Sequence, residues 1–332
     1  INNLKVSRKL TVISIAFITP ILVLLWFLIS EQNIRIDFGQ KEICGNMYLR
    51  PLKKILEVSP DFYYNEKKQS IDGTNNSSKN SSIKLTVDAQ LAELEKIDTE
   101  LDDILNAKEK ITTLKSKWQS VQSNSSDFSA HENFTKELRS VISYVGDKSN
   151  LILDPDLDSY YIMDATLLKL PENMDLLYQI MNYSYEIIHN GTITADEKTN
   201  LTVLTGLLKT NMNNLYLGIN VSFDNNPAEN LRPALSSELE TTKQATDNLL
   251  NYIQTNILNG EQLTATNSEF DNLAYTALNK NFRLWDSGIL NLDGLLNTRI
   301  AGFREGKYFT LGSVFLILAI SIWLVVYISR NI

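Results

Sequence analysis

Two long uncharged stretches constrain this sequence more than any other feature. Residues 10–30 and 308–329 contain no charged side chain and are mostly apolar. As an α-helix, a run of about 20 such residues crosses the hydrocarbon core of a bilayer. Pro20 is compatible with this, because neighbouring helices can satisfy the carbonyl group that a proline frees. We therefore predict transmembrane helices at residues 10–30 and 308–329.

Basic residues at the outer ends of these stretches predict their orientation. Lys5, Arg8 and Lys9 precede the first stretch, and Arg330 follows the second. Because basic flanks stay in the cytoplasm, residues 1–9 and 330–332 are expected there, and residues 31–307 on the outer side. No small-residue cleavage site follows the first stretch, which predicts an uncleaved signal anchor. The chain starts at Ile1 and stops soon after the second stretch, so we expect it to belong to a longer protein.

Residues 31–307 have the periodicity of an all-α fold. Apolar residues recur at threes and fours, and no segment alternates as a strand does. We predict an elongated extracytoplasmic bundle of roughly seven helices, long enough for two stacked modules. In the first half, the expected boundaries are a kink or split at 49–51, a helix end at 59–60, a mobile polar loop at 72–82, and helices at 87–121 and 128–153. In the second half they are a break or restart of the helix at 171, a helix end at 190–191, a capping box at 194–197 and a turn at 224–227. A helix at 228–258 and a last helix from 267 into the second stretch follow.

The densest chemistry lies in residues 150–164, with the sequence NLILDPDLDSYYIMD. A structural interpretation makes Asp154 the N-cap of a helix and places Pro155 at its first position. Asp156 and Asp158 then lie in the first turn, where the helix dipole favours anions. An EF-hand loop is excluded, because its sixth position is Ser159 instead of glycine, and its twelfth is alanine instead of glutamate.

A functional interpretation of the same stretch is a ligand pocket between helices. Tyr160 and Asp164 are four residues apart and share a helix face, while Tyr161 points about a quarter turn away. Aromatic faces beside a carboxylate suit a cationic or amine ligand. Both interpretations stay open at this point. The candidate ligand-binding residues are Asp156, Asp158, Tyr160, Tyr161 and Asp164.

Composition and spacing argue against several other classes. The net charge of −8 and the lack of basic clusters argue against nucleic acid. His131 and His189, expected at the surface or at helix caps, and Cys44, expected as a packed thiol that could alternatively cross-link two copies, have no zinc-site spacing. No nucleophile elbow, phosphate loop or HExxH motif is present. We expect no enzyme, metal site or cofactor in this chain. Four arginines are expected to be solvated or ion-paired: Arg50, Arg139, Arg232 and Arg283.

The sequence resembles the sensor region of bacterial transmembrane receptors, namely methyl-accepting chemotaxis proteins and sensor histidine kinases. One subgroup opens with a phrase similar to residues 36–52 and carries another similar to residues 149–164, followed by a match to Leu170-Pro171. The resemblance implies a homodimer in the bacterial inner (cell) membrane, with a periplasmic or extracellular domain. That domain would bind an unknown small molecule and signal through the second span to an output module. Residues around Asn76 resemble an insertion.

Two alternatives to a ligand sensor stay open. One is a membrane-anchored module that binds a protein partner, such as a solute-binding protein, and the other is a structural spacer. An enclosed polar pocket favours ligand sensing, whereas an exposed apolar patch favours a protein partner.

Overall fold

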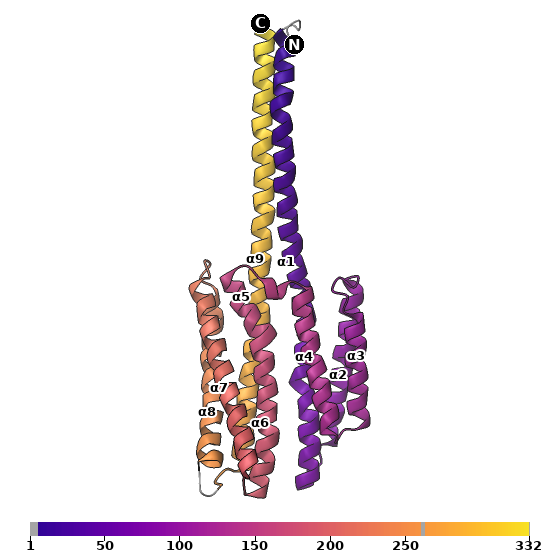
Figure 1. Ribbon diagram of the computed structural model, residues 1–332, viewed down its shortest axis with the longest axis vertical. Helices are drawn as coiled ribbons and strands as arrows, with labels where there is room; N and C mark the ends of the chain where they lie inside the picture. The colour runs from indigo at the N-terminus through magenta and orange to yellow at the C-terminus, as the bar shows by residue number, and fades with distance from the viewer. Residues whose placement is uncertain (1–5, 260–262, 332) are drawn as a thin grey trace. The chain divides into compact units, whose positions relative to one another are not determined.

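The chain forms helices and no strands in the part described by the structure, a computed structural model that covers residues 6–259 and 263–331. The contacts divide these residues into two compact units (Figure 1), which are residues 6–41 with 296–331 and residues 42–259 with 263–295. The first and last helices, α1 (Val6–Asp72) and α9 (Asn267–Asn331), contribute to both units. The predicted all-α class is confirmed for these residues.

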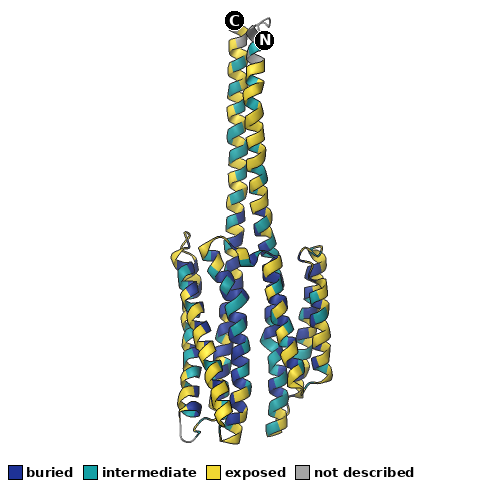
Figure 2. Ribbon diagram, in the orientation of Figure 1, coloured by how far each residue is buried: buried dark blue, intermediate teal, exposed yellow. Residues whose placement is uncertain are grey.

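The smaller unit contains the two apolar stretches. Segments of α1 and α9 reach mean hydropathies of 2.8 and 2.6, and both helices are long enough to cross a membrane. Exposed residues run along both stretches (Figure 2). Among them are large apolar side chains, such as Phe17 at 71% and Phe315 at 76%. Just beyond the stretches, Lys307 Nζ donates to Asn33 Oδ1 at 2.7 Å, and Arg35 lies over the Phe303 ring at 5.6 Å. Helices of this composition are typical of membrane proteins.

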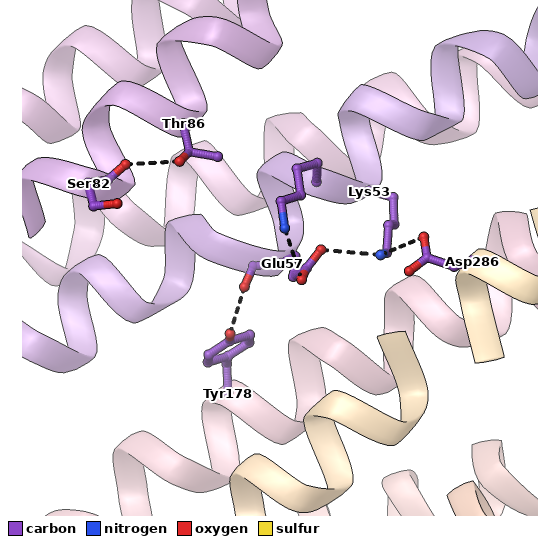
Figure 3. Close-up of polar contacts among 7 residues, drawn as sticks. Lys53, Glu57, Ser82, Thr86, Tyr178 and Asp286 are labelled. Carbon is purple, nitrogen blue, oxygen red and sulfur yellow. Dashed lines mark hydrogen bonds and ion pairs between the residues drawn. The ribbon is translucent and has the colours of Figure 1, made fainter. Parts of the chain in front are cut away.

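In the larger unit, α1 and α9 run antiparallel and are joined by polar contacts. Asn46 donates to the Ile289 carbonyl at 2.9 Å. Farther along, Lys53 Nζ lies 2.7 Å from Asp286 and 3.2 Å from Glu57 (Figure 3). Lys53 is only 5% exposed. A buried charge needs partners of opposite charge, and the two carboxylates supply them.

Two groups of helices pack beside this pair. One comprises α2 (Ser77–Glu100), α3 (Lys108–Ser123) and α4 (Phe128–Lys148), and its Trp118 and His131 rings contact Phe62 of α1 at 5.9 and 5.6 Å. The other comprises α5 (Leu157–Asp164), α6 (Leu170–Asn190), α7 (Ala195–Asp224) and α8 (Leu231–Ile253), and Thr242 of α8 donates to the Lys280 carbonyl of α9. The groups lie beside the same stretch of α1 and α9 (Figure 1), so the two stacked modules are not the arrangement observed.

The helix end predicted at 59–60 is wrong, and α1 is not split at 49–51. The helix continues through Pro51 and Pro60 to Asp72. A proline in a helix interior removes one hydrogen bond and crowds the preceding turn. Around Pro51 the cost is offset by dense packing, because Leu49, Leu52 and Ile55 are at most 1% exposed. Burial of such side chains is worth about 1.5–3 kcal/mol each.

The predicted mobile loop is also shorter than expected. Only residues 73–76 are irregular, and α2 begins at Ser77. Asn65 Nδ2 donates to Asn80 Oδ1 at 3.0 Å, and Asn76 Nδ2 donates to the Asn65 carbonyl at 3.2 Å. Asn76 and Asn80 are nearly buried, so this polar sequence forms a fixed amide network.

Polar residues also divide the helix predicted at 87–121. Asp102, Asp103 and Asn106 have positive φ angles near 50°, and the chain reverses between α2 and α3. Asn and Asp adopt this conformation more readily than other non-glycine residues. Asn150, at φ 67°, ends α4 before the predicted residue 153.

Other predicted helix ends are confirmed. Gly191 ends α6 at φ 67°, and Thr194 and Glu197 form the capping box that begins α7. The helix predicted at 228–258 begins at Leu231 and finishes as a π-helix, Gln254–Leu258. Pro171, predicted to break or restart its helix, lies in the first turn of α6, which follows directly on a π-helix, Ala165–Lys169. Gly260, predicted to follow a helix end, lies outside the described residues.

Candidate functional site

Residues 150–164 form the joint between α4 and α6, and the helix within them begins later than predicted. Helix α5 begins at Leu157 with Asp156 as its N-cap, so Pro155 precedes the helix. The Asp154 carboxylate still organises the turn, because Oδ1 accepts from the Asp156 N–H at 3.0 Å and from Ser159 Oγ at 2.8 Å. These hydrogen bonds fix the turn at Asp154, because a residue that precedes a proline disfavours the helical conformation.

The candidate residues of this stretch are only partly brought together. Tyr160 and Tyr161 meet edge to face, with ring centroids 5.2 Å apart. Asp158 Oδ2 accepts from Asn226 Nδ2, in the turn that follows α7, at 3.1 Å. Asp164 lies at the end of α5, where burial raises its pKa against the opposing charge of Lys169. Asp156 is exposed.

Four glycines let this joint approach the backbone of four helices. A Cβ atom at any of them would lie within 3 Å of a side chain in residues 149–167. The contacts are Gly45 of α1 with Ser149 and Leu151, Gly146 of α4 with Leu167, Gly218 of α7 with Tyr161, and Gly288 of α9 with Thr166. The stretch therefore connects both helix groups, and a ligand role for its five candidate residues stays a prediction.

We expect Ser159→Ala to destabilise the joint. Ser159 is 2% exposed, and its hydroxyl is a donor to a carboxylate that is itself nearly buried. Loss of a buried hydrogen bond to a charged group costs about 1.5–3 kcal/mol. Chemical unfolding of the full chain in detergent micelles, followed by far-UV circular dichroism, would measure the change. Ser116→Ala on the exposed face of α3 is the control, and an equal effect of both variants would contradict the prediction.

A cavity of about 440 Å³ lies elsewhere in the larger unit, between α1, α4 and α6. Each helix offers one face to it, since the lining positions are spaced by threes and fours. They are Leu56, Pro60, Tyr63 and Lys67 of α1, Phe128, His131, Glu132, Thr135 and Lys136 of α4, and Asp175, Tyr178, Gln179, Asn182, Tyr183 and Glu186 of α6. None of the five candidate residues lines this cavity.

One wall of the cavity is aromatic. The Tyr63 ring lies 5.3 Å from that of Phe128 and 5.2 Å from that of His131. His131 is 7% exposed, so of the two places predicted for it, the surface or a helix cap, the surface is wrong. Its Nε2 lies 2.8 Å from the Ser125 carbonyl oxygen, which requires the proton on Nε2, and burial lowers its pKa. The neutral ring then has an acceptor at Nδ1.

The opposite wall is polar. Lys67 Nζ donates to the Asn182 carbonyl at 2.7 Å and pairs with Glu186 Oε1 at 2.7 Å. The Lys67 side chain is 10% exposed, and burial lowers its pKa despite this pair. Asn182 Nδ2 donates to the Tyr178 carbonyl, while the buried Asn182 Oδ1 has no partner among the described residues. An unmade buried hydrogen bond is costly, so a ligand donor that reaches this oxygen would stabilise the site.

Sequence reasoning missed this cavity although a signal was present. Tyr63 and Lys67 continue the apolar face of Leu56 and Pro60 with a polar end, beyond the helix end predicted at 59–60. On α6, residues 175, 179, 182 and 186 place polar side chains along a face next to the core. Such a stripe has no distinctive motif, and only the meeting of three helices makes it a cavity.

A second cavity, of about 520 Å³, has a mainly polar lining and lies beside the C-terminal end of α1 and the start of α9. Tyr64 donates to Asp271 Oδ1 at 2.5 Å, and Lys68 pairs with Asp271 Oδ2. Nearby, Tyr275 of α9 donates to Asp61 of α1 at 3.1 Å, and burial raises the pKa of Asp61 to about 6. Of the charged residues that line this cavity, Lys68 and Asp271 already pair with each other.

Metal ligands and known relatives add nothing to this geometry. No group of three or more His, Cys, Asp or Glu side chains that could hold a metal ion occurs within residues 6–259 and 263–331. No family model, curated protein or solved structure matches the chain.

Proposed function

We propose that this chain is the ligand-sensing input region of a bacterial transmembrane signalling receptor. The observation that supports it most directly is that α1 contains the first apolar stretch and also lines the 440 Å³ cavity. A ligand in that cavity would contact the helix that leads to the membrane. The resemblance of residues 36–52 and 149–164 to receptor sensor regions points to the same function.

The proposed mechanism is a ligand-dependent displacement of α9 relative to α1. The helices are coupled by polar pairs, including Lys53 with Asp286 and Arg50 with Asp293. A ligand shifts such an equilibrium only as far as its affinities for the two arrangements differ. Displacements of 1–2 Å or so between packed helices are an established mode of switching. The second apolar stretch, as part of α9, would transmit the displacement inward.

A chimera tests the sensing proposal. We expect the full chain, joined after residue 331 to the cytoplasmic signalling module of a characterised receptor, to change its output when a cavity ligand is added. A tenfold difference in affinity between the two arrangements corresponds to about 1.4 kcal/mol, enough to shift a balanced equilibrium to about 10:1. The control chimera carries Gln179→Trp, which fills the cavity. An unchanged output with a ligand that demonstrably binds would refute sensing.

Topology is tested separately with single cysteines. We expect Ser116→Cys, in a chain whose Cys44 is replaced by serine, to react with a membrane-impermeant maleimide in intact cells. A cysteine within residues 1–9 should react only after the membrane is permeabilised, because the basic flank is expected inside. The reverse pattern would overturn the orientation and with it an outward-facing sensor.

A protein-binding module is the second candidate. Val203 and Leu207 lie four residues apart on α7 and are 54% and 50% exposed, as an apolar stripe for a partner would be. Cross-linking from cysteines at these positions, without response of the chimera to any small molecule, would favour it over the sensor.

A further inference from the structure

We infer that the cavity between α1, α4 and α6 binds an organic amine as its ammonium form, with an apolar body against the Tyr63 and Phe128 rings. The inference rests on the proposed function, because it names the ligand class that the sensor region would detect. The cavity volume of about 440 Å³ falls within the range of small-molecule sites, which is roughly 300–1,000 Å³.

The aromatic wall is the first feature that selects an ammonium ion. The faces of aromatic rings carry negative potential, so they attract cations within about 6 Å of the centroid. The Tyr63 ring already attracts one cation in this way, since Lys67 Nζ lies 6.0 Å from its centroid. Phe128 is 46% exposed beside it, so its ring presents an apolar surface to solvent. A ligand with an apolar body and a positive end would cover both rings.

Hydrogen-bond acceptors of two residues that line the cavity are the second feature. The Asn182 amide is oriented by the bond from its Nδ2 to the Tyr178 carbonyl, 3.0 Å away, which leaves Oδ1 buried without a donor. His131 adds an acceptor at Nδ1, because its Nε2 carries the proton. An ammonium group is a donor without lone pairs, so it complements these atoms, whereas a carboxylate has no proton to offer them.

The charges around the aromatic wall point the same way. The pKa of Tyr63 is raised by burial and then by the charges of Glu186 and Asp127. Glu66 and Asp127 oppose the lowering of the His131 pKa by burial. Carboxylates therefore contribute negative potential at this wall, where Lys67 contributes the opposite charge. Lys67 occupies only Oε1 of Glu186, and a carboxylate can accept from several donors, so the pair leaves room for a second cation.

Matched probes on the full chain in zwitterionic lipid nanodiscs test the inference. The probes are 2-phenylethylammonium, 3-phenylpropanoate and 2-phenylethanol, which share a ring and differ in charge. Isothermal titration calorimetry up to about 10 mM covers weak binders, with empty nanodiscs as the blank. We expect saturable binding of the amine, and binding of the acid and the alcohol at least about tenfold weaker.

Variants locate the binding. Asn182→Leu removes the acceptor and should weaken the amine about fivefold or more, whereas Asn182→Asp adds a charge there and should tighten it. Asn220 provides the matched control, because its Nδ2 donates to the carbonyl four residues earlier on α7, as that of Asn182 does on α6. Asn220→Leu and Asn220→Asp should leave the affinity unchanged. Tyr63→Leu should weaken the amine about fivefold through the lost ring.

Each result decides the question, including the case in which Asn182→Leu fails to fold, because Asn182→Asp and Tyr63→Leu remain. The inference is overturned if no amine binds, if the acid binds as tightly, or if the Asn182 and Asn220 variants behave alike. Amine binding without any change in the output of the chimera would keep the ligand class and refute sensing. A response of the chimera to some other ligand, without amine binding, would refute the amine as the ligand class and keep sensing.

Discussion

Gly45→Ala is expected to destabilise the larger unit by about 3 kcal/mol, a large effect for one added methyl group. A Cβ atom on Gly45 would lie 2.2 Å from Ser149 Oγ, 2.4 Å from Ser149 Cβ and 2.8 Å from Leu151 Cδ1. Ser149 Cβ is fixed to its own backbone, so it cannot rotate away as the end of a long side chain could. The clash must therefore move α1 away from the joint between the helix groups.

The same substitution elsewhere separates this clash from the general effect of alanine. Gly218 and Gly206 both lie in α7, but only a Cβ on Gly218 meets a side chain, at 2.9 Å from Tyr161 Cδ1. We expect Gly218→Ala to destabilise by about 1–2 kcal/mol, because the ring can shift. Gly206→Ala should stabilise by about 0.5–1 kcal/mol through its helix propensity.

Chemical unfolding of the full chain in detergent micelles, monitored by far-UV circular dichroism, measures all three variants. The expected order of stability is Gly206→Ala, wild type, Gly218→Ala and then Gly45→Ala. If Gly45→Ala were as stable as Gly206→Ala, the close approach of Ser149 to α1 would be wrong.

Helix content was predictable because it depends on local periodicity. The capping box at Thr194 and Glu197 and the end at Gly191 were correct, since both depend on residues within one turn. The core positions of Tyr48 and Trp285, each 0% exposed, follow from the same apolar stripes. Arg50, Arg139 and Arg232 are ion-paired as expected.

The incorrect predictions involve contacts between distant segments. Pro51 and Pro60 normally end a helix, but α1 continues because several other helices pack around it. The asparagines near residue 76 suggested a mobile loop, yet Asn65, eleven residues away, fixes one of them. The cavity depends on α1, α4 and α6 meeting, which no single segment encodes. His131 was unremarkable in sequence and lies in its wall.

Asp61→Asn is expected to stabilise the protein by about 2–3 kcal/mol at neutral pH and to change how its stability depends on pH. Burial raises the pKa of Asp61 to about 6, from an ordinary value of 3.8. Its neighbours are Tyr275, Lys68 and Lys79, which favour the charged form, and Asp271, which opposes it. Between about pH 4 and 6, the folded state therefore keeps a proton on Asp61 that the unfolded state has released. The free energy of unfolding should fall as the pH rises through this range, from about 4 to 6, and then level off.

Asparagine has the same shape as aspartate and can still accept the Tyr275 hydroxyl through its own oxygen, but it has no charge to bury. The wild type and Asp61→Asn should therefore unfold at similar denaturant concentrations near pH 4 or so, and diverge progressively up to about pH 6. Asp224→Asn is the control, because that side chain is 70% exposed and its charge stays in water. The comparison requires unfolding curves of the three proteins across this pH range in one detergent. Parallel curves for the wild type and Asp61→Asn would show that the Asp61 carboxylate is hydrated, and that α1 and α9 pack less tightly around it than the structure shows.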